Sequence, residues 1–496
     1  MARPTTSKYD VIVVGAGNAA LTAALSACEA GASKVLVLEK ASYALRGGNS
    51  RFTGGIFRFT YSGLPDIKEL IPTLTPAELA AMEVGTYDHD DYYKAIMRVT
   101  EGLADPELTR VVIEESASTA RWMAHLGVEW DLTFLFARTV GGVRYFNPGT
   151  VIEAKGRGPG LVVALFKAAE KKEAIEIRYE TKMTRLLMDS RGVVYGVTIK
   201  NREGFHDIHS KAVILACGGF EANTEMRVKY LGPEWNTVKV RGTRYDTGDG
   251  LRAALEMGAQ PFGQWSGCHA TPIEANAPPV GDVEIFDRTN RVAYMYSIML
   301  NARGERFVDE GEDLGSYTYA KTGRAILGQP RGIAFQVFDA KTHDLREERY
   351  SVLSTPASAN TLDELAEKLA IDSDVLVSTV RRFNEGVRGG EFNPGLKDGK
   401  GTRGVVPPKS NWALPLDTPP FVAYPVCCGI TFTFGGLKVN TRAQMLDTED
   451  NVIPGLYATG EITGGFFYHN YTAGAGLMRG AVFGRLAGGN AVVDMR

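Results

Sequence analysis

The chain is 496 residues long, with 44% hydrophobic and 23% charged residues, so it has the composition of an ordinary folded protein with core enough for about three domains. Its 55 Lys and Arg nearly balance 58 Asp and Glu, and the net charge of −3 gives no overall field that would attract nucleic acid or anionic lipid. The five cysteines form no C-x-x-C pair, which argues against a disulfide framework or a Cys-ligated cluster.

Residues 1–8 lack the apolar core of a signal peptide, and no apolar run approaches the roughly 18 residues of a membrane span. Together with the cysteine pattern, which favours a reducing compartment, this predicts a cytoplasmic protein.

The first strand and turn carry a nucleotide-binding pattern. Tyr9-Asp-Val-Ile-Val-Val-Gly15 predicts a strand buried on both faces of a parallel sheet, and residues 15–20 fit G-x-G-x-x-A before an Ala-rich helix over 21–30. Gly15 allows the sharp turn, Gly17 lets backbone approach a pyrophosphate, and Ala20 permits close helix packing. The helix N-terminus then offers free N–H groups to an anion.

A second predicted strand, residues 34–39, ends in an acid. Glu39 stands 22 residues beyond Gly17, which fits a carboxylate that holds the ribose hydroxyls of adenosine. Strand, turn, helix, strand and acid together predict binding of a dinucleotide, either FAD or NAD.

Two later segments favour FAD. Arg46-Gly-Gly-Asn-Ser50 and Thr53-Gly-Gly55 supply backbone N–H and hydroxyl donors for phosphate and flavin. Near the other end, residues 456–461 predict a strand that ends in Gly-Glu, followed by a helix over 477–493. A domain built from both ends of the chain, meeting at the flavin, is therefore expected.

Three further segments complete a family resemblance. With Ile214-Leu-Ala-Cys-Gly-Gly-Phe220, Thr247-Gly-Asp-Gly250 and Gly304-Glu-Arg-Phe-Val-Asp-Glu310, the chain resembles the flavoprotein family of fumarate reductase and succinate dehydrogenase over nearly its whole length. Residues 429–437 and 467–476 are most similar to the FAD-dependent tricarballylate dehydrogenases of that family.

The resemblance implies an α/β fold: a Rossmann-like FAD-binding domain split between N- and C-terminal segments, with an inserted α+β cap domain. We place the first part of the FAD-binding domain at residues 1–265, the cap at 266–427 and the second part at 428–496. Helical spacing of apolar residues between Leu362 and Val380, broken near Asp372, predicts two cap helices.

The expected cofactor is non-covalent FAD, because the segment around residues 46–53 lacks the family's covalent-attachment histidine. The predicted cofactor-binding residues are Gly15, Gly17, Asn18, Ala19, Ala20, Glu39, Lys40, Gly47, Gly48, Asn49, Ser50, Thr53, Gly54, Gly55, Gly218, Asp249, Gly460, Glu461, Gly476 and Leu477. No metal is expected in the site.

Departures from the family pattern disfavour fumarate reduction. The family's proton-delivering arginine is missing from residues 311–317, Phe432 stands where a histidine is expected, and Asn470-Tyr471 replaces an N-R dipeptide that clamps a carboxylate. The family's H-P-T histidine does have a counterpart in His269.

Oxidising a C–C bond to an alkene needs a hydride acceptor, a base and stabilisation of enolate charge. Tyr471 resembles the tyrosine of the Y-P-G-P-G element of 3-ketosteroid dehydrogenases, so Tyr471 and the N–H of Ala475 are expected to polarise a substrate oxygen. His469 and His269 are candidates for substrate binding or proton transfer. Tyr319, or its neighbour Tyr317, is the candidate proton relay.

Arginines are favoured for recognising carboxylates. Arg144, Arg241, Arg244 and Arg479 all lie beside Gly-, Asn- or Tyr-rich segments, and we prefer Arg244 and Arg479 because they flank family motifs.

The leading hypothesis is dehydrogenation of a C–C bond next to a carboxylate, specifically tricarballylate to cis-aconitate. A 3-ketosteroid-type or other enone dehydrogenase or reductase is the first alternative, and a non-catalytic flavin electron-relay protein is the second. Because the chain has no haem or cluster motif, electrons are expected to leave through an external acceptor or a partner protein.

Overall fold

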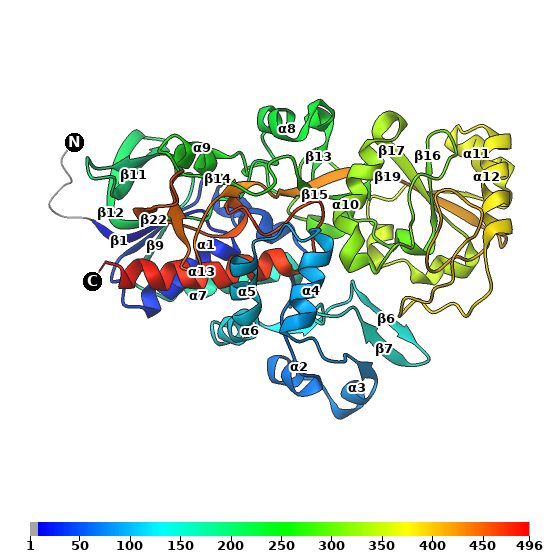
Figure 1. Cartoon of the computed structure of the whole chain (residues 1–496), viewed down its shortest axis with the longest axis horizontal. Coiled ribbons are helices and arrows are strands. Elements are labelled where there is room, and N and C mark those ends of the chain that lie inside the picture. Colours follow the sequence, from blue (N-terminus) through cyan, green and yellow to red (C-terminus); the bar gives the residue numbers. More distant parts are fainter. Residues whose placement is uncertain (1–7, 496) are drawn as a thin grey trace.

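A parallel β-sheet is built around β1 (Tyr9–Val14), the first strand of the chain. In the computed structural model, which describes residues 8–495, β1 lies between β2 (Val35–Leu38) and β12 (Gly204–Leu215). β9 (Ile175–Arg178) extends the sheet beyond β2, and β22 (Val452–Ala458) extends it beyond β12, all in parallel. Because β22 comes from the C-terminal end, the sheet confirms the Rossmann-like domain assembled from both ends of the chain (Figure 1).

Two helices from opposite ends of the sequence cover this sheet. α1 (Asn18–Glu29) directly follows β1, and α13 (Ala475–Val493) packs along it (Figure 1). Both begin two or three residues earlier than their apolar patterns predict, at the glycine turns that precede them. α7 (Arg157–Glu170) also packs against α1.

An antiparallel extension and several small elements complete this part of the molecule. β10 (Lys182–Met188) and β11 (Val194–Asn201) extend the sheet from β12. The other elements are β3 (Ile56–Phe57), α2 (Leu64–Leu70), α3 (Pro76–Ala80), β4 (Met82–Glu83), α4 (His89–Val99), α5 (Pro106–Glu114), α6 (Ser116–His125), β5 (Trp130–Leu132), β6 (Ala137–Val140), β7 (Val143–Phe146), β8 (Ile152–Ala154), α8 (Thr224–Leu231), α9 (Asp249–Leu255), β14 (Pro261–Phe262), β20 (Gly436–Leu437) and β21 (Gln444–Leu446).

A second sheet forms the cap, and its longest strand is β19 (Phe421–Thr433). Strands β13 (Lys239–Val240), β15 (Cys268–Glu274), β16 (Ile298–Asn301), β17 (Ile333–Phe338) and β18 (Ala357–Ala359) join it. β19 runs through residues 427 and 428, so one strand spans the predicted boundary between cap and FAD-binding domain. The exact domain limits stay a prediction.

The predicted pair of cap helices is confirmed as α11 (Leu362–Leu369) and α12 (Ser373–Gly386). The break between them has a local cause: the Asp372 side chain accepts a hydrogen bond from the Val375 N–H and caps α12. A third cap helix, α10 (Gly315–Leu327), packs against β15. Gly323 makes this approach possible, because a Cβ there would lie 2.6 Å from the backbone of Ala270.

None of the helices within residues 8–495 has both the length and the apolar character of a membrane span. The N-terminal segment considered for a signal peptide lies, up to residue 7, outside the described residues.

Candidate active site

The turn after β1 forms a tight cradle at the N-terminus of α1. Gly15 has a φ of 109°, and a Cβ there would lie 2.3 Å from the Ala216 carbonyl oxygen, so only glycine fits. Three residues on, the Asn18 N–H donates to the Ser50 hydroxyl over 2.9 Å, which ties the turn to the predicted phosphate-binding segment. The geometry matches the predicted approach of backbone to a pyrophosphate.

Glu39 lies at the end of β2 and faces the same cavity. Its Oε1 accepts the Ala41 N–H at 2.8 Å, and the side chain is buried. Burial raises the pKa of this carboxyl, although the Ala41 and Gly47 N–H groups and the charge of Lys40 oppose the rise. The carboxyl is thus held in place to accept a hydroxyl group of a ligand.

Glu39→Ala is expected to weaken FAD retention by about 1–3 kcal/mol, because ribose hydroxyls would lose their acceptor in a buried site. FAD affinity measured by fluorescence titration of the apoprotein tests this. Glu29→Ala is the control, since Glu29 is an exposed acid at the end of α1 that pairs with Trp122. Equal FAD affinity of Glu39→Ala and the parent would remove Glu39 from the site.

Lys40 and Asp249 form an ion pair beside Glu39. The Lys40 Nζ lies 2.8 Å from the Asp249 carboxylate and 2.7 Å from the Thr247 hydroxyl, and Lys182 joins from β10 at 2.8 Å. Burial alone would raise the pKa of Asp249, but the two lysines hold it well below its usual range. This network brings the predicted Thr247–Gly250 motif to the cavity wall.

Two adjoining cavities run through the predicted cofactor residues and share six lining residues, Asn18, Ala19, Asn49, Ser50, Gly460 and Glu461. The first is also lined by Gly15, Gly17, Glu39, Lys40, Gly48, Gly218 and Asp249, and the second by Thr53, Gly476 and Leu477. Four predicted residues, Ala20, Gly47, Gly54 and Gly55, line neither cavity. Ala20 is buried within the helix packing, and Gly47 and Gly55 have positive φ values that shape the turns. Residues that sequence analysis missed also line the first cavity, namely Thr181, Lys182, Met183, Cys217, Thr243, Tyr245 and Asp246.

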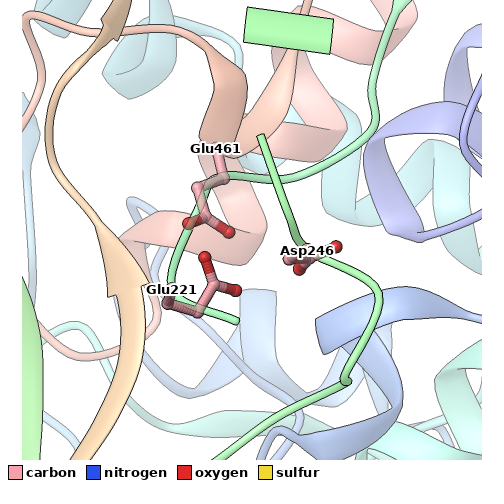
Figure 2. Close-up of side chains that lie close together, drawn as sticks. All are labelled: Glu221, Asp246 and Glu461. Atoms are coloured by element: carbon pink, nitrogen blue, oxygen red, sulfur yellow. The ribbon is translucent and has the colours of Figure 1, made fainter. Parts of the chain in front are cut away.

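Three acids, Glu221, Asp246 and Glu461, meet between the cavities, each with a carboxylate oxygen within 4.8 Å of the others (Figure 2). Burial is the main reason why the pKa of each is raised, and the mutual repulsion of the carboxylates adds to it for Glu221 and Asp246. Protons shared among these oxygens therefore explain their close packing. Asn49 donates to Glu221, and the Thr433 N–H donates to Glu461 at 2.8 Å, so the cluster joins the predicted Asn49 segment to β19.

Four aromatic rings cluster in the wall of the second cavity, and three of them belong to predicted catalytic residues. The His269 ring lies 4.8 Å from the Tyr319 ring and 5.1 Å from the Tyr471 ring, measured between centroids, and Phe432 lies 5.1 Å from each of His269 and Tyr471. His269 is on β15, Tyr319 on α10 and Phe432 on β19, so cap elements bring three of these rings to Tyr471. The predicted grouping of His269, Tyr319 and Tyr471 is observed.

His269 is neutral in this environment. Burial, and after it the charge of Arg241, lowers the pKa of the imidazole well below its usual range. Its Nδ1 has no hydrogen-bond partner among residues 8–495. A neutral, unpartnered ring in the cavity wall is able to accept a proton or bind a polar group.

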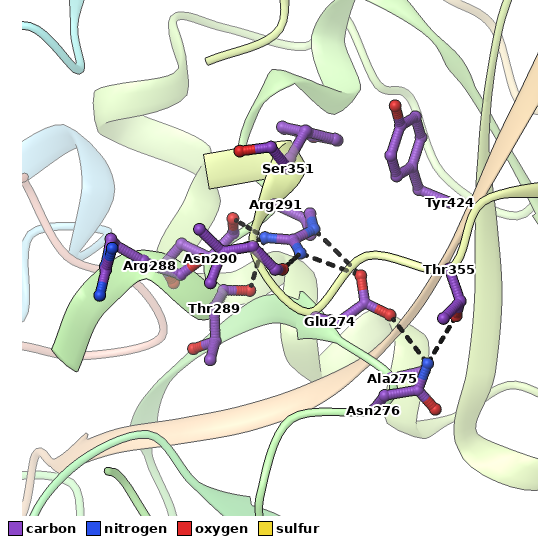
Figure 3. Close-up of polar contacts among 12 residues, drawn as sticks. Glu274, Ala275, Asn276, Arg288, Thr289, Asn290, Arg291, Ser351, Thr355 and Tyr424 are labelled. Carbon is purple, nitrogen blue, oxygen red and sulfur yellow. Dashed lines mark hydrogen bonds and ion pairs between the residues drawn. The ribbon is translucent and has the colours of Figure 1, made fainter. Parts of the chain in front are cut away.

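A buried ion pair anchors β15 at the end opposite His269 (Figure 3). The Arg291 Nη2 lies 3.0 Å from Glu274, both side chains are fully buried, and the guanidinium also donates to carbonyl oxygens, including that of Val352. Asn276 bridges Glu274 to the Thr355 hydroxyl. Since the partners satisfy each other, the pair fixes β15 against the following loop.

The Tyr471 hydroxyl is paired with an amide of the following turn, and the Ala475 N–H, predicted to act with Tyr471 on a substrate oxygen, is bonded elsewhere. The Gly476 N–H donates to the Tyr471 oxygen over 3.1 Å, whereas the Ala475 N–H donates to the Thr472 carbonyl oxygen. Gly474, with a φ of 82°, turns the chain so that the amide reaching Tyr471 is one residue later. Because its oxygen accepts from Gly476, the Tyr471 O–H is free to donate to a ligand.

Of the predicted pair Arg244 and Arg479, only Arg479 lines the second cavity, together with Arg241. Arg241 and Arg479 line the second cavity, whereas Arg244 is exposed and lines neither cavity. Arg241 extends the pairing of β13 with β19, since its N–H donates to the Ile430 carbonyl oxygen, and this points it inward. Arg244 follows in the turn before α9. Arg144 donates to the Thr133 carbonyl oxygen and lines neither cavity.

Both inward arginines keep donors available. Arg241 donates to the Thr431 hydroxyl and the Phe52 carbonyl oxygen, which leaves Nη2 without a hydrogen bond to the described residues. Arg479 stacks on Phe466 and Phe467, and its buried Nε lacks a hydrogen-bond partner among residues 8–495. Burial lowers the pKa of Arg479 to about 10, so it is still charged at neutral pH. The cavity therefore holds two cations for an anionic ligand.

His469 does not join this group. It is exposed, and its ring and backbone N–H both contact Gln264, at 3.2 and 2.7 Å. The cause is a turn at residues 468–470, in which His469 has a φ of 59° and points away while Tyr471 points inward.

Comparisons with known proteins agree with this site. The family model described as FAD binding domain matches residues 10–477. The chain is 30% identical over 486 residues to the probable fumarate reductase Ifc3 of Shewanella frigidimarina (strain NCIMB 400), covering 97% of this chain and 74% of that protein. It is 29% identical over 569 residues to 4-oxocyclohexanecarboxylate 2-dehydrogenase of Sinomonas cyclohexanicum, covering 97% and 92%.

The solved structure of the open conformation of a flavocytochrome c3 fumarate reductase is similar, with a TM-score of 0.73, 26% identity and coverage of 99% of this chain and 79% of that one. A 3-ketosteroid Δ1-dehydrogenase from Sterolibacterium denitrificans shares the fold, with a TM-score of 0.74, 20% identity and coverage of 98% and 100%.

The chain belongs to the FAD binding domain family. It is a flavoprotein of the fumarate reductase and succinate dehydrogenase type, an FAD-dependent oxidoreductase acting on CH–CH bonds, as the sequence predicts.

Proposed function

We propose that this enzyme dehydrogenates a C–C bond next to a carboxylate, and that its substrate is tricarballylate, converted to cis-aconitate. The observation that carries the proposal is the second cavity, where Arg241 and Arg479 face the same space as Tyr471 and His269 and adjoin the cofactor cradle. Two buried cations in one cavity suit a substrate with several carboxylates better than a neutral one.

FAD fits the first cavity by the chemistry of its walls: the α1 N-terminus and Ser50 for phosphate, Glu39 for ribose hydroxyls, and the Gly460–Glu461 turn near the join of the cavities. When bound, FAD supplies the acceptor for one hydrogen of the substrate as a hydride.

The residues of the second cavity account for the rest of the reaction. Arg241 and Arg479 bind carboxylates and orient the substrate. The hydrogen on the neighbouring carbon leaves as a proton to the His269–Tyr319 pair, in which the unpartnered imidazole Nδ1 is the proton acceptor. The electron pair of that C–H bond becomes the new double bond, and the Tyr471 O–H, backed by the Gly476 N–H, stabilises the enolate oxygen that develops.

An anaerobic substrate screen tests this proposal. Tricarballylate, succinate and a 3-ketosteroid are mixed separately with the FAD-loaded protein, and loss of the oxidised flavin absorbance near 450 nm is followed. Bleaching by tricarballylate, and not by the ketosteroid, is expected. Bleaching by the ketosteroid alone would replace the proposal with enone chemistry.

A ketone substrate is the second candidate because the Tyr471 O–H, held by the Gly476 N–H, also suits a carbonyl oxygen. The name 4-oxocyclohexanecarboxylate 2-dehydrogenase gives one relative a substrate with both a ketone and a carboxylate. The 3-ketosteroid Δ1-dehydrogenase shares the fold of this chain. Arg241 and Arg479 favour the carboxylate substrate over the ketone.

In either reaction, the electrons leave the reduced flavin through a soluble acceptor or a partner protein. The cytoplasmic location stays a prediction.

We also infer that FAD is bound non-covalently. Acid precipitation is expected to release intact FAD into the supernatant, because the segment of residues 46–53, where the family's covalent-attachment histidine is expected, has none. Chromatography of the supernatant identifies the nucleotide. Flavin that stayed with the precipitate would contradict this inference.

A further inference from the structure

Arg58 is a buried charge with no part in the reaction described above. It directly follows β3, and its exposed fraction is 0%. Within residues 8–495 it forms no ion pair with a carboxylate, and its Nη2 has no hydrogen-bond partner. A fully buried, unpaired charge is costly to fold, so a specific role is expected to maintain it.

Phenols take the place of a counter-ion. The Nη1 of Arg58 donates to the Tyr87 hydroxyl and the Pro148 carbonyl oxygen, both at 2.8 Å, and to the Tyr317 hydroxyl at 3.4 Å. The guanidinium also lies 5.2 Å from the Tyr317 ring centroid and 5.4 Å from that of Tyr87. An arginine side chain stays protonated in proteins, so the charge persists inside this ring of phenols.

The remaining donors of Arg58 hold the segment that carries Tyr471. The Nε donates to the Ala473 carbonyl oxygen at 2.8 Å, and the Arg58 backbone N–H donates to the Gly474 carbonyl oxygen at 3.3 Å. These two acceptors lie between Tyr471 and Gly476, whose amide reaches the Tyr471 hydroxyl. Arg58 therefore holds residues 473 and 474 by hydrogen bonds, in the middle of the turn that joins Tyr471 to Gly476.

We propose that Arg58 is a positioning residue of the oxidoreductase site, which fixes the 471–476 turn and places an unpaired positive charge behind the Tyr471 hydroxyl and the Gly476 amide. The inference rests on the proposed function of that pair. In a site of low dielectric, a fixed charge behind the Tyr471 hydroxyl strengthens its hold on a developing oxyanion. The charge also opposes the rise that burial causes in the pKa of Tyr471 and of Tyr319.

The test compares Arg58→Met, Arg58→Lys and Arg98→Met with the parent, all as FAD-loaded protein. Arg98 is the matched control because it lies 4.6 Å from the Tyr317 ring centroid but is half-exposed and pairs with Asp313. Arg58→Lys keeps the charge and loses the forked donors. The saturated rate of flavin reduction by tricarballylate and the half-saturating concentration are measured for each protein.

Arg58→Met is expected to slow the saturated rate of flavin reduction by about 10-fold or more, with little change in the half-saturating concentration of tricarballylate. Arg58→Lys should recover part of the lost rate, and Arg98→Met should match the parent. An Arg58→Met enzyme that lost affinity for tricarballylate as much as rate, or that was no slower than Arg58→Lys, would show a packing role only and would overturn the proposal, as would an unchanged rate.

A second measurement separates this inference from the identity of the substrate. Amide hydrogen exchange across residues 470–476 needs no substrate and is expected to be faster in Arg58→Met and unchanged in Arg98→Met. If the parent fails to oxidise tricarballylate yet this exchange pattern appears, the proposed function fails and the positioning role stands. Parental exchange in Arg58→Met would overturn the positioning role, whatever the substrate.

Discussion

Tyr471→Phe is expected to slow reduction of the flavin by about 10- to 1000-fold while FAD stays bound, a cost comparable to losing one oxyanion-hole donor. The hydroxyl lies in the wall of the second cavity, and it already accepts the Gly476 N–H, so its own proton is free for the substrate oxygen. Phenylalanine keeps the ring contacts with His269, Phe432 and Phe467. The rate is therefore expected to change more than substrate binding.

Stopped-flow absorbance under anaerobic conditions measures this rate and the half-saturating substrate concentration together. Tyr468→Phe serves as the control, because Tyr468 lies in the same segment but lines neither cavity. If Tyr471→Phe reduced its flavin at the parental rate, Tyr471 would be a packing residue only, and stabilisation of the enolate would pass to the Gly476 amide and His269.

Arg241→Gln is expected to raise the half-saturating concentration of tricarballylate by about 100-fold or more, since leaving a buried carboxylate unpaired costs about 3 kcal/mol or more. Arg479→Gln should act in the same direction. Arg244→Gln is a matched control three residues away, and it should behave like the parent because Arg244 is exposed. Steady-state kinetics of the three variants, with the flavin spectrum as a check on folding, decides among them.

The opposite pattern would be decisive against the arginine assignment. A strong effect of Arg244→Gln with normal kinetics for Arg241→Gln would mean that the exposed turn before α9 moves over the substrate. Indifference of all three variants would indicate a neutral substrate and favour the ketone reaction.

The FAD-binding half of the site could be predicted from sequence because its constraints are local. Gly15 is required by a positive φ and a 2.3 Å approach of backbone, and Glu39 follows from its place at the end of β2. Such backbone requirements act within a single turn of the chain, so they can be recognised from the spacing of residues in the sequence. The split domain was also predictable, since the Gly460–Glu461 turn repeats the pattern of a strand that ends at a nucleotide.

The substrate-binding part of the site could not be predicted as well, because tertiary packing decides which side chains face the cavity, and residue spacing in the sequence does not reveal that packing. Arg241 and Arg244 sit in equivalent sequence surroundings, and only the pairing of Arg241 with Ile430 on β19 turns one inward. Likewise, the positive φ of Gly474 decides that Gly476 rather than Ala475 reaches Tyr471. The exposure of His469 follows from a single turn residue with a φ of 59°. Arg58 gave no sequence signal, because its partners come from four separate segments.

The most direct test of the central claim is a single turnover of the FAD-loaded protein with excess tricarballylate in the absence of oxygen. The flavin absorbance and the organic acids are measured in the same samples. Carboxylate-directed dehydrogenation predicts full bleaching and one cis-aconitate formed for each FAD reduced. Fully FAD-loaded protein that kept its oxidised spectrum and formed no cis-aconitate would contradict the account.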